Sequence, residues 1–256
     1  MSNSPLVKYT KLSPNHSGQR QHKIDTITPH CVVGHLSLET LGNVFSSSSR
    51  QASSNYGIDD NGKVGMYVEE KNRSWCTSSQ SNDNRAVTIE IASDAKHPYR
   101  ITDKALQGFI DLSVDICKRN NIPKLLWKGD KTLIGQIDKQ NITVHRWFSK
   151  KDCPGEYIFN QLTYVADEVN KILLPKKQSS ITNPVELNPK EFQVKINTTS
   201  LNYRRGPGTN YPTLGIVRKN EVYTITEEAF GVGSSKWGKL KNSAGWISLD
   251  FCIRMG

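Results

Sequence analysis

A break in composition near residue 180 constrains the fold of this chain more than any other feature. The segment "LLPKKQSSITNPVELNPKE" contains three prolines and two serines and shows no hydrophobic periodicity, which is typical of an interdomain linker. The chain has 256 residues, which is enough for one large domain or two smaller ones. We therefore predict two domains, residues 1–174 and 191–256, joined by a linker over residues 175–190.

The part before the linker alternates between strand-like and helix-like patterns. In "RAVTIEIAS", apolar residues alternate with polar ones, which indicates a strand, and we predict further strands in "TITPHCVVGHL", "KVGMYVEEK" and "NITVHRWF". Apolar residues recur at helical spacing over residues 102–122, where Thr102 or Asp103 would be the cap, and over residues 155–174. This alternation predicts an α/β domain whose mixed central sheet is flanked by helices.

The part after the linker shows no helical pattern. It is a series of short strand-like runs that are interrupted by Gly, Pro and Asn. A segment of about 65 residues with this pattern predicts a small all-β barrel.

The charge of the chain favours an anionic partner without identifying it. Lys and Arg number 34 and Asp and Glu 24, which gives a formal net charge of +10 that is spread over both parts. Nucleic acid, anionic lipid and the teichoic acids of a bacterial wall would all suit a basic surface, and plain solubility explains it equally well. A nucleic-acid role is the weakest of these, because the sequence contains no basic helix, zinc finger or stacked-aromatic RNA motif.

Two further patterns bear on the compartment. No run of about 18 apolar residues is present, so we expect no membrane span, and the first 23 residues lack the apolar core of a signal peptide. The five cysteines are odd in number and scattered, which argues against a disulfide framework. We therefore expect synthesis in the cytoplasm.

Three residues suggest a metal-dependent hydrolytic site. His30, His145 and Cys153 offer two imidazoles and one thiolate, and a fourth coordination position left open distinguishes a catalytic zinc site from a structural one. Lys150 and Lys151, beside Cys153, are expected to favour its thiolate form. His30 lies 115 residues before His145, so only the fold could bring the three together.

Four separated motifs then carry a resemblance to a known family. They are "ITPHCVVGH", "SSNYGIDDNGKVGMYVEEKNRSW", "NDNRAVTIEIAS" and "TVHRWFSKKDCPGEY". In this order they resemble the zinc-dependent N-acetylmuramoyl-L-alanine amidases of type 2, a superfamily that includes peptidoglycan-recognition proteins, over roughly residues 20–175. The likeness is greatest to phage or prophage endolysins of Gram-positive bacteria, and no motif separates a lysin from an autolysin.

The resemblance implies roles for particular residues. His30, His145 and Cys153 match the zinc ligands, and Glu90 matches an acidic residue that activates the attacking water. Lys151 matches a lysine that stabilises the developing oxyanion, and Tyr56 matches a tyrosine that lines the site. Where relatives often carry a histidine after "GMYVEE", this chain has Trp75–Cys76, so the surroundings of the leaving group depart from the family pattern.

The C-terminal part resembles a bacterial SH3 domain. The segments "LNYRRGPGTNYPTLGIVRKNEVYTI" and "WGKLKNSAGWISLDFC" carry this likeness, over about residues 193–254. Such modules bind peptidoglycan peptides or cross-bridges. The resemblance implies an aromatic and basic groove that would be formed by Tyr203, Arg205, Tyr211 and Trp237, whereas Trp246 is better suited to the barrel core.

Together these patterns predict a peptidoglycan hydrolase that cleaves the amide bond between N-acetylmuramic acid and L-alanine. Its partner would be the peptidoglycan of Gram-positive bacteria, reached after release through a holin or lysis. Two alternatives stay open: a wall-binding protein without catalysis, and a thiol peptidase that uses Cys153 and His145. The second is disfavoured because papain-type enzymes place the nucleophile before its base in the sequence.

Overall fold

The computed structural model describes residues 2–174, 191–241 and 245–255. The chain forms two compact units, Met1–Lys176 and Lys177–Gly256. The predicted linker, residues 175–190, lies outside the described residues.

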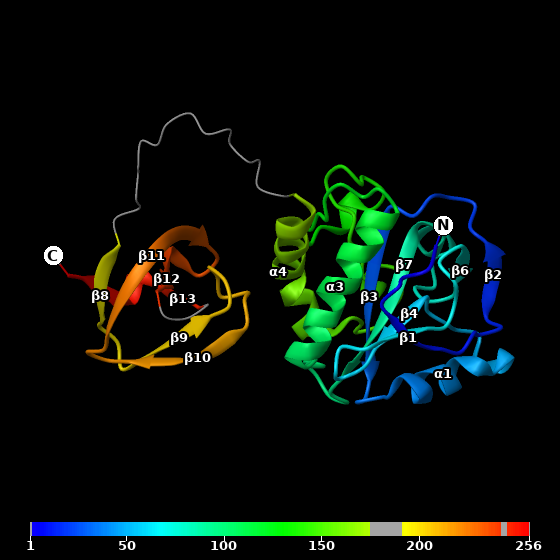
Figure 1. Ribbon diagram of the computed structural model, residues 1–256, viewed down its shortest axis with the longest axis horizontal. Helices are drawn as coiled ribbons and strands as arrows, with labels where there is room; N and C mark the ends of the chain where they lie inside the picture. Colours follow the sequence, from blue (N-terminus) through cyan, green and yellow to red (C-terminus); the bar gives the residue numbers. More distant parts are fainter. Residues whose placement is uncertain (1, 175–190, 242–244, 256) are drawn as a thin grey trace. The chain divides into compact units, whose positions relative to one another are not determined.

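The first unit is built on a mixed five-stranded sheet (Figure 1). β3 and β4 both run parallel to β7, whereas β4 and β5 are antiparallel. A separate pair, β2 and β6, lies outside this sheet. In spatial order, the sheet strands are β1 (Val7–Thr10), β5 (Val64–Met66), β4 (Tyr56–Ile58), β7 (Ala86–Ser93) and β3 (Thr26–Val33), and the separate pair is β2 (His16–Gln19) and β6 (Asn72–Ser74). The α/β class and the mixed sheet predicted from the sequence are confirmed.

Helices cover both faces of this sheet. The long helices α3 (Asp103–Arg119) and α4 (Gly155–Leu173) pack together on one face, and α1 (Leu38–Ser46) packs against β4 and β5 on the other (Figure 1). The predicted cap of α3 is confirmed, since the Thr102 hydroxyl accepts a hydrogen bond from the Ala105 amide at 3.0 Å. The remaining helices are short: α2 (Gln80–Arg85), η1 (Ser48–Arg50), η2 (Lys131–Leu133) and η3 (His145–Trp147).

One predicted strand is wrong. Residues 141–148 make a single bridge to the sheet, between Ile142 and Ile27, and then turn into the 3₁₀ helix η3. The amide of Thr143 still donates to the carbonyl of Ile27 at 3.1 Å, so the segment runs along the free edge of β3. His145 is therefore held beside β3 by a short helix.

The second unit is a seven-stranded antiparallel sheet, which confirms the all-β prediction. One apolar cluster, which includes Val194, Ile225 and Ile247, forms its core. In spatial order its strands are β10 (Thr213–Arg218), β9 (Ser200–Arg204), β13 (Trp246–Ser248), β12 (Ser234–Leu240), β11 (Val222–Gly231), β8 (Phe192–Ile196) and β14 (Cys252–Arg254), with η4 (Leu249–Phe251) between β13 and β14.

Candidate active site

His30 and Glu90 lie side by side on the central sheet. His30 in β3 pairs with Glu90 in β7, and Glu90 pairs with Gly57 in β4. Residues in register on neighbouring parallel strands point to the same face of the sheet. A side chain at Gly57 would come within 2.6 Å of Leu41 in α1 and 2.7 Å of Tyr67. His30 and Glu90 therefore point to the face that carries α1, where Leu41 and Tyr67 cover Gly57.

The loop between η3 and α4 brings His145 and Cys153 to the same place. The amide of Arg146 donates to the carbonyl of Cys153 at 2.9 Å, which closes this loop. After it, Gly155 turns the chain into α4 with a φ of +80°, where a Cβ would approach Tyr99 to 2.8 Å. This turn places Cys153 beside His30 of β3, although the two residues are 123 positions apart in the sequence.

These three side chains form a compact group. The Cys153 sulfur lies 3.2 Å from His30 Nδ1, and the rings of His30 and His145 are 5.0 Å apart between centroids. One ligand atom from each of the three lies within 4.8 Å of the others. This spread suits a single ion of tetrahedral geometry, for which nitrogen and sulfur ligands lie at about 2.0–2.3 Å.

The protonation states of the two imidazoles suit metal binding. Burial, reinforced by His145, lowers the pKa of His30 well below its ordinary value. Burial and then Lys151 lower the pKa of His145. Both rings are therefore neutral at neutral pH, which is the form that binds metals. Each also has a buried Nε2 with no hydrogen-bond partner among the described residues. For His30 the other nitrogen, Nδ1, faces Cys153 and Glu90, so Nδ1 is the atom placed to bind an ion beside them.

The expectation that nearby lysines favour a thiolate at Cys153 is wrong. Contact with the Cys31 thiol, followed by burial and by the charge of Glu90, raises the pKa of Cys153 well above its ordinary value. Without a bound ion the residue is a neutral thiol, which is a poor nucleophile. This observation weighs against the thiol peptidase.

Glu90 has the electrostatics of a group that exchanges protons near neutral pH. Its side chain is 18% exposed. Burial raises the pKa of Glu90 to about 8, although a hydrogen bond from Cys76 and the charge of Arg50 oppose the shift. A carboxyl group with a pKa near the working pH both accepts and releases a proton readily.

A cavity of about 520 Å³ opens onto this group. Glu90, His145 and Lys151 all line it, so the cavity joins three of the predicted site residues. Lining residues that the sequence did not single out include Arg50, Gln51, Arg73 and Ser78. These residues come from η1 and its cap, from β6 and from the loop before α2, and only the fold brings them together, so the local sequence carries no signal for them. A larger cavity of about 670 Å³ lies elsewhere in this unit, around Ile24 and Ile122, and none of the predicted site residues lines it.

Comparison with known proteins identifies the family of this chain. Residues 20–156, more than half of the chain, match the family model described as N-acetylmuramoyl-L-alanine amidase. The chain belongs to this family. It is a peptidoglycan hydrolase that cleaves the amide bond between N-acetylmuramic acid and L-alanine. The comparison of this chain with curated proteins found no match.

Solved structures similar to the amidase include three endolysins. A mutant endolysin from Bacillus subtilis is 17% identical with a TM-score of 0.49, and the match covers 64% of this chain and 99% of that one. The endolysin amidase LysCS from Clostridium intestinale URNW is 14% identical, covers 61% and 91%, and has a TM-score of 0.42. The Ph2119 endolysin from a Thermus scotoductus bacteriophage is 11% identical, covers 59% and 89%, and has a TM-score of 0.42.

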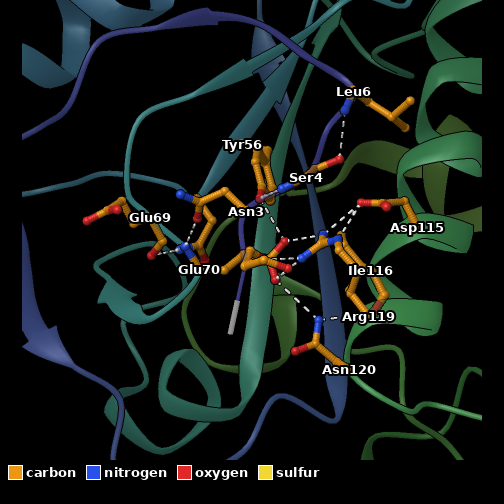
Figure 2. A network of polar contacts seen from close by, with 12 residues as sticks. Asn3, Ser4, Leu6, Tyr56, Glu69, Glu70, Asp115, Ile116, Arg119 and Asn120 are labelled. Carbon is orange, nitrogen blue, oxygen red and sulfur yellow. Dashed lines mark hydrogen bonds and ion pairs between the residues drawn. The ribbon is translucent and has the colours of Figure 1, made fainter.

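Tyr56 is not part of the amidase site, which corrects the expectation from its motif. Its ring is fully buried, and its hydroxyl donates to Glu70 Oε1 at 2.7 Å and accepts from the Ser4 amide at 2.9 Å (Figure 2). Arg119 of α3 pairs with the same carboxylate, with Nη1 2.9 Å from Oε2. Tyr56 precedes Gly57 in β4, so it points to the opposite face, toward α3. It holds the N-terminal segment in place and lies away from the cavity.

The predicted groove of the second unit is mostly core. Trp237 is only 2% exposed, and Tyr211 and Trp246 are also buried, so Trp237 and Tyr211 cannot present a binding surface. The expectation of a buried Trp246 is confirmed. Arg205 donates its backbone amide to the carbonyl of Pro212 at 2.9 Å.

Tyr203, one of the four predicted residues, lines a cavity of this unit. That cavity measures about 430 Å³. Its other walls are Ile216, Val217, Val222, Tyr223, Thr224, Leu240 and Lys241. The ring of Tyr203 would meet a Cβ at Gly215 or Gly245 at 2.5 Å, so both glycines make room for it.

Among the described residues, no helix is long and apolar enough to cross a bilayer.

Proposed function

We propose that the amidase is zinc-dependent, and that His30, His145 and Cys153 bind the ion. The observation that carries this proposal is the convergence of the three side chains beside Glu90, which lies in register with His30. A bound zinc ion would lower the pKa of a water molecule and polarise the scissile carbonyl.

The other two residues then have separate tasks. Glu90 takes a proton from the attacking water and passes it to the leaving amine of L-alanine, for which its raised pKa is suited. Lys151 lies on the wall of the same cavity and stabilises the negative charge that develops on the carbonyl oxygen. Glu90 lies 4.0 Å from Nδ1 of His30 and lines the same cavity as Lys151, which supports this division of roles.

Mass spectrometry of digested peptidoglycan tests the bond cleaved. New free amino groups on L-alanine with intact glycan strands are expected, whereas new reducing ends would contradict an amidase. A chelator should abolish this activity and zinc should restore it. Activity that survives chelation and is lost only on thiol alkylation would support the thiol peptidase instead.

We further propose that the second unit is a bacterial SH3-like domain that binds the wall. The cavity around Tyr203 supports this, because two tyrosines and apolar side chains line it beside Lys241, a composition suited to a wall peptide. Tethering a weak binder to the catalytic unit raises the local concentration of substrate.

Sedimentation of the full chain with purified Gram-positive cell walls tests this role. Tyr203→Ala should reduce the bound fraction. Phe230→Ala is the matched control, because Phe230 is an aromatic side chain, 82% exposed, on β11 and outside the cavity. Equal binding by both variants would contradict the proposed site.

The remaining parts of the proposal concern the substrate and the place of action. The substrate is Gram-positive peptidoglycan, with anionic wall polymers as further partners, and the enzyme reaches it after release as an endolysin or autolysin.

A further inference from the structure

Cys76 points a thiol at the proposed general base. Its sulfur lies 3.9 Å from Glu90 Oε1, and both residues line the catalytic cavity. Cys76 belongs to the pair Trp75–Cys76, where the sequence departs from the family pattern, and it has no role in the proposed function.

The backbone of Cys76 is held firmly in this position. The amide of Cys76 donates to Asp83 Oδ2 at 3.0 Å. The next residue, Thr77, binds the same carboxylate with its amide at 3.1 Å and its hydroxyl at 2.6 Å. Asp83 belongs to α2 and is buried, so one helix fixes the loop that carries the thiol. The sulfur therefore faces Glu90 without needing a rearrangement.

The donors around Cys76 form a second group of metal-ligand type. Ligand atoms of His30, Cys76 and Glu90 lie within 4.8 Å of one another, as do those of His30, His145 and Cys153. A tetrahedral zinc ion with a sulfur ligand at about 2.3 Å and an oxygen ligand at about 2.0 Å separates these atoms by about 3.5 Å. The observed 3.9 Å between sulfur and oxygen requires a shift of only a few tenths of an ångström.

We propose that Cys76 and Glu90 form a second metal site, which binds excess zinc or another thiophilic divalent ion and inhibits the enzyme. This inference rests on the proposed function, because an ion in the first site engages His30. The second ion is then left with Cys76 and Glu90 as its protein ligands and binds more weakly than the first. A carboxylate bound to a cation cannot accept a proton from water, so occupation of this site removes the general base.

Metal stoichiometry of the full chain tests the proposal directly. The protein is dialysed against rising zinc concentrations, and bound zinc is measured by atomic absorption. The unaltered chain should bind one equivalent and then a second, whereas Cys76→Ser and Cys76→Ala should stop at one. Cys252→Ser is the matched control, because Cys252 is a partly buried thiol in the other unit, and it should still bind two.

Two further readouts follow the same variants. Titration with cadmium after the first equivalent should add an ultraviolet thiolate-to-metal absorption band in the unaltered chain and in Cys252→Ser only. The second readout is the ratio of each protein's activity at excess zinc to its own activity at one equivalent of zinc. This ratio should fall for the unaltered chain and Cys252→Ser and stay near one for the Cys76 variants.

The outcomes separate the two proposals. A second equivalent that binds equally well to the Cys76 variants, or an unaltered chain that never exceeds one equivalent, overturns the second site. Failure of the first equivalent to bind overturns the zinc site of the proposed function instead.

Discussion

Nδ1 of His30 and Oε1 of Glu90 lie 4.0 Å apart, on paired residues of the parallel strands β3 and β7. The sheet thus places a proposed metal ligand and a proposed general base at a fixed separation. A one-residue slip between the strands would move one of them to the opposite face. The register of β3 and β7 is therefore the main structural requirement of the site.

Replacing Glu90 by Gln should abolish most of the activity while leaving the fold intact. The amide is nearly the same size but cannot accept a proton, and general base catalysis typically contributes about 10²–10⁴-fold. Release of soluble wall fragments measures the rate, and circular dichroism checks the fold. Glu39→Gln, an exposed change in the first turn of α1, is the control and should keep the rate. Near-full activity of Glu90→Gln would make Glu90 a structural residue.

Stability of the metal-free protein should depend on Glu90 in a defined pH window. Its folded pKa of about 8 lies above the ordinary 4.5, so between these values the folded state holds a proton that the unfolded state releases. Stability relative to Glu90→Gln is therefore full below pH 4.5 and falls as the pH rises to 8, by up to about 1.4 kcal/mol per pH unit. Denaturant unfolding of both proteins with a chelator present measures this difference, and a difference independent of pH would contradict the shift.

The local sequence predicted those parts of the site that depend on one strand or one helix. Alternation within β7 placed Glu90 on the face opposite Ile89 and Ile91, and the helical spacing located α3 and α4 to within a few residues. These features follow from periods of 2 and 3.6, which neighbouring residues carry.

What the local sequence could not predict depends on pairing between distant strands. The face to which Tyr56 points is decided by the register of Gly57 with Glu90. The protonation of Cys153 depends on Cys31, which is 122 residues away in the chain. Trp237 is an apolar core residue in β12, although its aromatic ring also suits a binding groove. In each case the deciding contact is long-range.

Cys153→Ser should weaken metal binding sharply. A serine hydroxyl replaces a soft thiolate, and even changes to residues that only support metal ligands typically cost about 10–100-fold in affinity. Equilibrium dialysis against buffered zinc measures the first equivalent directly and does not depend on activity. Cys117 is buried in α3, so Cys117→Ser is not a suitable control. Cys252→Ser is the control instead, and it should bind zinc as the unaltered chain does. Equal affinity in Cys153→Ser would exclude Cys153 as a ligand.

Tyr56→Phe should reduce stability and leave the turnover of the folded enzyme unchanged. The hydroxyl supplies one of the hydrogen bonds to Glu70, whose side chain is fully buried, and loss of a partner from a buried polar group costs about 1–3 kcal/mol. Arg119 and Asn120 still contact the carboxylate, which favours the lower end of this range. Denaturant unfolding measures the loss, and Tyr9→Phe, outside this network, is the control. A drop in turnover per folded molecule, with stability unchanged, would contradict the placement of Tyr56 outside the active site.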